Sequence, residues 1–308
     1  TKSRAQMRLN SAGHSAAVAR ATSYFSPSSA YGDVTGGIAF YQFLEDLSKN
    51  FEERKNTLME KLKETAERLF TADNLIVSFT ADEKGWDGMK KSLKLLTDAL
   101  PETGGERYTF TCDKENKNEG FMTSSQVNYV ARCGSFAESG LPYTGALRTL
   151  KVILGYDYLW LNARVKGGAY GVMNGAGRTG EGYFVSYRDP NLKETNQVFE
   201  NVVKYLEEFD ADERDMTKYV IGTISDLDVP LLAPYKGSKA DAAYFSHLTD
   251  EMIKKEREEI LKATKEDIRA LAPVIREILS TGSFCVIGNA EKIRENQELF
   301  GEVKNLFN

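Results

Sequence analysis

Histidine and cysteine are scarce in this sequence, which limits the metal and redox chemistry that it could support. The 308 residues include two histidines and three cysteines. Neither His14 nor His247 begins an H-E-x-x-H or H-x-x-E-H pattern, and no recognisable Ser-His-Asp set accompanies them. Cys112, Cys133 and Cys285 stand far apart with no C-x-x-C pair, which argues against a disulfide framework or a zinc knuckle. We predict reduced, mostly buried thiols, packed histidines and no self-sufficient metal site.

The sequence also lacks an excess of positive charge and a long hydrophobic run. Lys and Arg number 40 against 45 Asp and Glu, a formal net charge of −5. Because nucleic-acid backbones require a basic surface, we expect no nucleic-acid partner. The most apolar stretch, Leu147 to Leu161, contains Arg148, Lys151 and Asp157, which excludes a membrane span. The composition, 41% hydrophobic and 28% charged, is typical of a soluble globular chain, and the length predicts about two domains.

The first part of the chain has the periodicity of amphipathic helices. Over residues 37–70, apolar residues recur three and four positions apart with charges between them, which predicts helix. Leu75 to Phe79 is a short apolar run bounded by polar residues, which predicts a strand. A further helix is expected from about Trp86 to Leu100. Residues 113–120 are polar and aperiodic, so we expect a linker there.

The second part mixes strands with helices. Asp189-Pro190 has the pattern of a helix cap followed by proline at the first helical position. Thr264-Lys265-Glu266-Asp267 resembles a capping box with Asp in place of Glu or Gln. The expected strands are Gln126 to Cys133, Gly182 to Tyr187 and Ser283 to Ile287. The expected helices are Tyr143 to Leu161, Pro190 to about Phe209, 217–223, 239–260, one opened at Thr264 and running through Leu279, and a terminal one from about Glu291.

Two distant segments have the same order of features. Leu75 to Asp82 and Ser283 to Glu291 both read as a strand, a small polar residue, Ala, an acid and then an amphipathic helix. Aligning Ala81 with Ala290 gives an offset of 290 − 81 = 209 residues, which suggests a duplicated domain rather than a solenoid. If the second copy starts near Glu119, the first would start about 90 residues ahead of the printed sequence. We therefore expect one complete domain and the end of another.

The densest run of glycines extends from Gly167 to Gly182. Within it, Gly175-Ala-Gly-Arg-Thr-Gly180 spells G-x-G-x-x-G, which in dinucleotide-binding folds lies between a strand and a helix. Here a strand-like run follows instead, and no Walker lysine is present. The segment therefore predicts a β-hairpin with glycines in its turn. A stand-alone nucleotide-binding enzyme remains a rival hypothesis, and a nucleotide-dependent rise in melting temperature would support it.

Arg164, Gly167, Gly168 and Tyr170 are not explained by the hairpin. Two glycines between an arginine and a tyrosine let the backbone turn sharply and approach a ligand closely. A guanidinium can hold a carboxylate or a peptide carbonyl, and a phenol can donate to a developing oxyanion. From spacing alone, a surface arginine and a packed tyrosine explain the pattern equally well.

Several motifs in sequence order resemble the presequence proteases, a branch of the pitrilysin/insulinase family of zinc metallopeptidases. They are Ser11-Ala-Gly-His-Ser-Ala-Ala-Val-Ala-Arg20, Gly36-Gly-Ile-Ala-Phe40 with Phe43-Leu44, Gln126-Val-Asn-Tyr-Val130, Arg164-Val-Lys-Gly-Gly-Ala-Tyr170-Gly, Ser186-Tyr-Arg-Asp-Pro-Asn-Leu192 and Ile221-Gly-Thr-Ile-Ser-Asp226. The resemblance extends along most of the chain and to the C-terminal half of those enzymes.

The resemblance implies a fold and an architecture. Members of the family have four related α+β domains, each an antiparallel sheet covered by helices, in two halves that close like a clamshell. Residues 1–118 would be the end of the third domain, an incomplete first copy. Residues 119–308 would be the complete fourth domain, which does not bind zinc. The H-x-x-E-H motif, its zinc and the glutamate base belong to the N-terminal half, so this chain would bind no cofactor.

The resemblance also implies site residues and partners. In the family's R-x-x-G-G-A-Y pattern, Arg164 would hold a substrate carbonyl and Tyr170 would hydrogen-bond the tetrahedral intermediate, with Gly167, Gly168 and Ala169 contacting substrate. The partners would be the N-terminal catalytic half and unfolded peptides enclosed in a chamber. Alone, the chain should be inactive, whether as a fragment or as a separate subunit. We expect a bacterial cytoplasm, with an organelle matrix as the alternative. The rival within this family is a non-catalytic scaffold subunit of a processing-peptidase-like complex.

Overall fold

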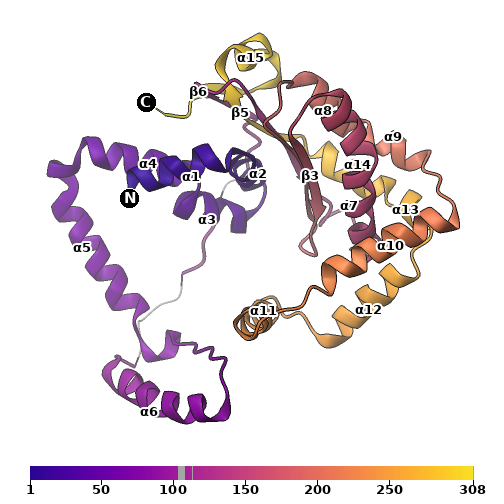
Figure 1. Cartoon of the computed structure of the whole chain (residues 1–308). Helices are drawn as coiled ribbons and strands as arrows, with labels where there is room; N and C mark the ends of the chain where they lie inside the picture. The colour runs from indigo at the N-terminus through magenta and orange to yellow at the C-terminus, as the bar shows by residue number, and fades with distance from the viewer. Residues whose placement is uncertain (103–107, 113, 308) are drawn as a thin grey trace. The chain divides into compact units, whose positions relative to one another are not determined.

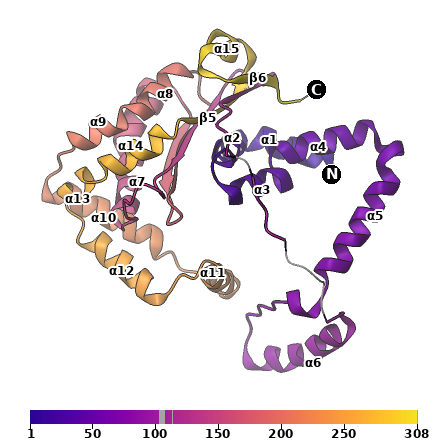
Figure 2. The same cartoon turned by 180° about the vertical axis from the view of Figure 1, so that it is seen from behind.

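A computed structural model of the protein describes residues 1–102, 108–112 and 114–307 (Figures 1 and 2). The chain forms two compact units, each described here by itself. The sheet unit comprises Thr1–Glu45, Phe110–Leu227 and Lys254–Asn308, and the helical unit comprises Asp46–Thr109 and Asp228–Ile253. Both units draw on residues from before and after Glu119, and the domain division at that point stays a prediction.

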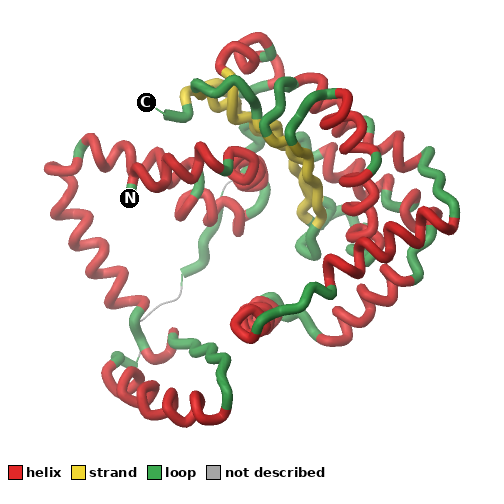
Figure 3. The backbone as a smooth tube through the Cα atoms, in the orientation of Figure 1, coloured by secondary structure: helices red, strands yellow, loops and turns green. Residues whose placement is uncertain are grey.

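The sheet unit contains one six-stranded sheet, with the strand order β3-β4-β2-β5-β1-β6 (Figure 3). The strands are β1 (Glu119–Thr123), β2 (Tyr129–Ser135), β3 (Gly171–Ala176), β4 (Glu181–Tyr187), β5 (Ser283–Asn289) and β6 (Glu302–Asn305). β1 runs parallel to both β5 and β6, whereas β2, β3, β4 and β5 pair antiparallel. The fold is α+β, as predicted, but the expectation of a wholly antiparallel sheet is wrong, because β1 and β6 join it in parallel. β1 also takes the last two residues of the predicted linker.

The helices surround this sheet and make up most of the helical unit. In the sheet unit they are α1 (Lys2–Ser11), α2 (Gly13–Ser23), α3 (Pro27–Gly36), α7 (Ala146–Tyr156), the π-helix η2 (Trp160–Lys166), α8 (Lys193–Glu200), α9 (Val202–Glu207), α10 (Glu213–Leu227), α13 (Lys265–Arg269), α14 (Ala272–Ser280), α15 (Ala290–Glu295) and the 3₁₀ turn η3 (Gln297–Leu299). In the helical unit they are α5 (Phe51–Leu69), the 3₁₀ turn η1 (Ala72–Asn74), α6 (Glu83–Ala99) and α11 (Ala233–Phe245). The helices α4 (Ile38–Lys49) and α12 (Asp250–Leu261) cross the unit boundaries.

Both faces of the sheet are buried, which explains the continuous apolar runs of its central strands. In β5, Phe284 and Val286 face a core that includes residues of α7 and α14. Cys285 and Ile287, which alternate with them, face a second core that includes residues of α2 (Figures 1 and 2). Cys133 is buried in the same second core, so the prediction of mostly buried thiols is confirmed.

A buried ion-pair network fastens α2 and α3 to the sheet. The Arg20 guanidinium lies 2.5 Å from the Asp33 carboxylate and 2.5 Å from the Glu119 carboxylate of β1. Glu119 is fully buried and also accepts hydrogen bonds from the Tyr24 hydroxyl, at 2.8 Å, and the Lys304 ammonium, at 2.7 Å. Burial alone would raise the pKa of the Glu119 carboxyl, but Arg20, with Lys304 and Tyr24, outweighs it and lowers that pKa to about 2.

Several local predictions are confirmed. Residues 37–70 are helical in α4 and α5. The glycine-rich segment forms the β3–β4 hairpin, with Gly180 at a φ of +83° in its turn, which differs from the strand-to-helix turn of a dinucleotide site. Thr264 opens α13 with the predicted capping box to Asp267.

Other local predictions are wrong. Leu75 to Phe79 has no strand pairing among the described residues. The expected helix from Tyr143 to Leu161 ends at Tyr156 and is followed by the π-helix. Asp189 caps no helix, because α8 begins four residues later at Lys193. Instead the Asp189 backbone pairs with Asn128, and its buried carboxylate accepts a hydrogen bond from the Thr195 hydroxyl at 2.7 Å.

Candidate functional site

The predicted site residues lie on a tight turn that leads from the π-helix η2 into the edge strand β3 of the sheet unit. Gly168 adopts a φ of +82°, which favours glycine. A Cβ on Gly167 would lie 2.5 Å from the carbonyl oxygen of Ala163. The Ala169 N–H donates to that same carbonyl at 3.1 Å. The two glycines are therefore required by the backbone path itself, whatever their contact with a ligand.

The turn is held in place from outside as well as from within. The Asn191 side-chain amide donates to the Gly167 carbonyl at 2.5 Å, and the Ala169 side chain is 3% exposed. The Tyr170 N–H donates to the Arg188 carbonyl at 3.3 Å, which ties the end of the turn to the residue after β4. Because Ala169 is buried, it packs the turn, and its predicted substrate contact stays a prediction along with those of Gly167 and Gly168.

Arg164 and Tyr170 come together in this turn, six positions apart in sequence. The guanidinium carbon of Arg164 lies 5.8 Å from the centre of the Tyr170 ring and 4.0 Å from the centre of the Trp160 ring. Within the described residues, the Arg164 side chain forms no ion pair and no hydrogen bond. Its planar N–H donors are therefore available to an acceptor outside the chain.

The Tyr170 side chain is exposed at the surface of the sheet unit. It is 66% exposed, and its hydroxyl has no hydrogen-bond partner in the described part of the chain. Its ring contacts Tyr187 of β4 edge to face, with the ring centres 5.9 Å apart. Tyr187 in turn contacts the His14 ring of α2 at 4.9 Å. The predicted alternative of a packed tyrosine is therefore wrong for Tyr170, whose hydroxyl can donate to a bound group.

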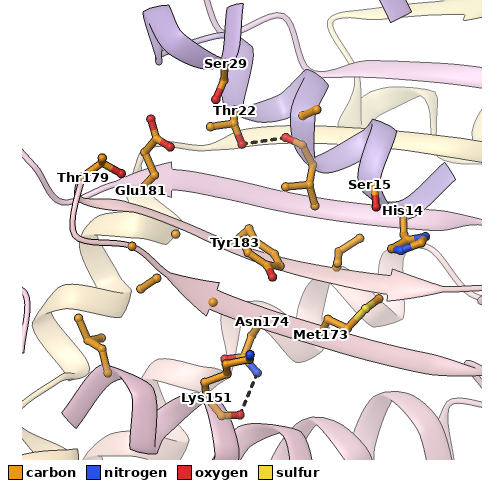
Figure 4. Close-up of a pocket in the computed structure, with 18 of the residues that line it drawn as sticks. His14, Ser15, Thr22, Ser29, Lys151, Met173, Asn174, Thr179, Glu181 and Tyr183 are labelled. Atoms are coloured by element: carbon orange, nitrogen blue, oxygen red, sulfur yellow. Dashed lines mark hydrogen bonds between the residues drawn. The ribbon is translucent and has the colours of Figure 1, made fainter. Parts of the chain in front are cut away.

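A cavity of about 640 Å³ begins at His14 and extends along the β3–β4 hairpin. Figure 4 shows polar side chains of three elements around it, among them His14 and Thr22 of α2, Lys151 of α7 and Asn174 of β3. His14 packs against tyrosines, as predicted for a lone histidine. Burial lowers its pKa, and its Nδ1 atom is buried without a partner among the described residues. Sequence reasoning missed this cavity, since α2 and the hairpin lie about 160 positions apart in the chain.

The described residues offer no group of three His, Cys, Asp or Glu side chains that could hold a metal ion. In the same residues, no helix combines the length and the apolar character needed to cross a membrane. The arrangement around Arg164 and Tyr170 can therefore donate hydrogen bonds to a carbonyl, carboxylate or oxyanion, but it contains no metal-ligating group of its own.

Comparison with known proteins identifies the family. A model described as the PreP C-terminal domain matches residues 118–289, more than half of the chain, and a model of a region associated with subfamily C of the M16 peptidases matches residues 1–47. Protein HypA of Clostridium perfringens is 39% identical over 99% of this chain and 31% of its own length. Presequence protease 1 of Arabidopsis thaliana, chloroplastic/mitochondrial, is 31% identical over 99% of this chain and 29% of its own length. The chain thus spans less than one third of each relative.

Among solved structures, a peptidase M16 inactive domain from Pseudomonas fluorescens aligns with a TM-score of 0.47 and 14% identity over 67% of this chain and 50% of that one. The family assignment depends on the sequence matches. The resemblance inferred from the motifs is confirmed, and this chain belongs to the PreP C-terminal domain family, in the presequence protease branch of the pitrilysin-like M16 peptidases.

Proposed function

We propose that this chain is the non-zinc-binding C-terminal half of a zinc metalloendopeptidase that degrades unfolded peptides in a closed chamber. Its partner is the N-terminal catalytic half, and its cargo is an unfolded peptide. On this proposal residues 1–118 are the end of the third peptidase-like domain and residues 119–308 are the fourth. A bacterial cytoplasm is the proposed location, with an organelle matrix as the alternative that the chloroplastic and mitochondrial names of relatives support.

One observation carries the proposal: Arg164 and Tyr170 meet on a rigid turn with their donors unoccupied by the described residues. Such a pair suits a peptide in the course of hydrolysis. The Arg164 N–H groups would hold a carbonyl oxygen of the peptide. The Tyr170 hydroxyl would donate to the oxygen that gains negative charge as the peptide carbon becomes tetrahedral. Both groups orient substrate, and neither needs to transfer a proton.

The residues of this chain do not fit the zinc ion that the family requires. A catalytic zinc takes three protein ligands, and no such group occurs among the described residues. We therefore place the zinc and the attacking water in the catalytic half, and we assign no step at the metal to residues of this chain.

Mixing the two halves tests the proposal. Peptide hydrolysis is measured with this chain alone, with the separately produced catalytic half and zinc alone, and with both together. Activity is expected only from the mixture. In that mixture Tyr170→Phe should lower kcat by about 10²–10³-fold, the usual loss of one oxyanion donor. The matched control is Tyr156→Phe, because Tyr156 is an exposed tyrosine, 77% accessible, at the end of α7.

Three outcomes are informative. Halves that associate without activity would favour the non-catalytic scaffold subunit. Full activity of the Tyr170→Phe mixture would refute the role given to Tyr170. Zinc-dependent hydrolysis by this chain alone would refute the proposed division of labour between the halves.

A further inference from the structure

Arg164 is bordered by an aromatic side chain that belongs to its own helical turn. Trp160 and Arg164 are four positions apart in the π-helix η2, and side chains at this spacing lie on one helix face. The guanidinium carbon is 4.0 Å from the centre of the Trp160 ring, closer than its 5.8 Å distance to the Tyr170 ring. Trp160 is therefore the ring that contacts Arg164 most closely.

Stacking on an indole orders a guanidinium without occupying its donors. The ring attracts the flat face of the cation, whereas the N–H groups point outward in the guanidinium plane. A free arginine side chain loses considerable rotamer freedom when it binds a carbonyl, and an arginine that is already stacked loses less. With no carboxylate of the described residues paired to Arg164, the indole supplies the order that an ion pair would supply elsewhere, and leaves the donors free.

The backbone around Trp160 is itself well anchored. The Tyr158 hydroxyl donates to the Val198 carbonyl at 3.0 Å, and the Asn162 amide donates to the Tyr158 carbonyl at 2.8 Å. π-helical turns are rare and occur frequently at functional sites. Trp160 is still 41% exposed, so its indole is not simply a core side chain.

We propose that Trp160 is a positioning residue, which holds the Arg164 guanidinium flat against its indole with the N–H donors presented to the peptide. This inference depends on the proposed function, since it assigns Arg164 a peptide carbonyl as its ligand. Trp160 itself need not touch substrate.

Tryptophan fluorescence tests the contact without any activity measurement. The chain contains two tryptophans, so Trp86→Phe leaves Trp160 as the single emitter. In that background Arg164→Ala should shift the Trp160 emission maximum and raise its quenching by acrylamide. Lys166→Ala is the matched control, because Lys166 is a cation of the same π-helix whose ammonium lies 3.3 Å from the Asn162 side-chain oxygen. Emission that does not respond to Arg164→Ala, or responds equally to Lys166→Ala, would overturn the inference.

Kinetics of the assembled halves test the positioning role. Trp160→Ala should raise KM by about two- to fivefold with little change in kcat, the size expected for a partly exposed cation–π contact. Trp160→Phe should retain part of the effect. On an Arg164→Ala background, Trp160→Ala should change nothing further, because it acts through Arg164. Fully additive losses would overturn the inference while leaving the role of Arg164 intact. If Arg164→Ala leaves the kinetics unchanged, the proposed role of Arg164 fails, and the positioning role fails with it even where the fluorescence shows the stack.

Discussion

Leu75 to Asp82 and Ser283 to Glu291 have similar sequences and different structures. Residues 283–289 form β5, which pairs with β2 on one side and β1 on the other. Residues 75–79 form no strand among the described residues, and Ile76 and Phe79 are 61% and 45% exposed. Each segment is followed by a capped helix, since Asp82 and Asn289 both accept a backbone N–H through their side chains. Local sequence therefore specifies the helix start in both places.

The difference lies in the partners available to each segment. A strand needs neighbours that take up its N–H and C=O groups and cover its side chains. β5 has both, with two neighbouring strands and a core on each face. Five apolar and small residues in a row are compatible with a strand, but they do not supply a partner. The comparison teaches that the repeat is a repeat of local signals, whose tertiary outcome differs.

The largest expected effect breaks the comparison at one aligned pair. Val286 and Val77 correspond at the 209-residue offset, since 286 − 77 = 209, yet they are 0% and 38% exposed. Val286→Asp should destabilise the sheet unit by about 4 kcal/mol, because it buries a charge without a partner. Val77→Asp should change stability by about 0.5 kcal/mol or less. Urea unfolding followed by circular dichroism measures both. Equal losses would mean that Val77 is as buried as Val286 in solution.

A second, smaller difference concerns ion pairs. Glu119 is buried in its network with Arg20 and Lys304, whereas Glu64 of α5 pairs with Lys61 and Arg68 in solvent. Glu119→Gln should cost about 3 kcal/mol, because it leaves buried cations with too little negative charge. Glu64→Gln should leave the unfolding curve unchanged within error. A wild-type midpoint for Glu119→Gln would show that the network adds nothing to the attachment of α2.

The same carboxylate predicts a pH dependence. The folded pKa of Glu119, about 2, is below its ordinary value of 4.5. A depressed carboxyl pKa contributes stability that is fully present above about pH 4.5 and is lost as the pH falls towards 2. The unfolding free energy of the wild type should therefore fall more steeply across this range than that of Glu119→Gln. Parallel curves for the two proteins would contradict the assigned ion pair.

The smallest expected effect sharpens the similarity of the two segments. Asp82→Ala and Asn289→Ala each remove a side-chain cap, with bonds of 2.8 Å to the Gly85 N–H and 2.9 Å to the Lys292 N–H. Each should cost about 1 kcal/mol, because a cap acts locally and does not depend on the sheet. Thermal unfolding of the two variants gives the comparison. A loss several times larger at Asn289 would show that its cap also supports the sheet.

Sequence reasoning identified the glycine turn because its signal is local. Gly167 and Gly168 meet conformational demands that few other residues can satisfy, and Arg164 and Tyr170 occupy fixed positions beside them. It did not predict that η2 would be a π-helix, or that Trp160 would stack on Arg164. α-helical and π-helical turns have the same apolar periodicity over so short a stretch, and only the hydrogen bonds to the turn that follows distinguish them.

Asp189 shows the opposite failure. Its proline neighbour and the helix downstream match the pattern of a cap, but its backbone bonds to Asn128, 61 positions earlier, and its carboxylate stays inside. A long-range partner took the place of the local one, and no window of sequence contains that partner.

The sequence alone determined where helices begin, where the glycine hairpin turns, and which family the chain belongs to, because caps, positive φ angles and motif order depend on neighbouring residues. Only the tertiary structure decided which apolar runs are strands, which carboxylates are buried, and which side chains accompany Arg164. Those outcomes depend on partners distant in the chain, whose approach is set by packing the whole sheet unit, and they cannot be read from any one segment.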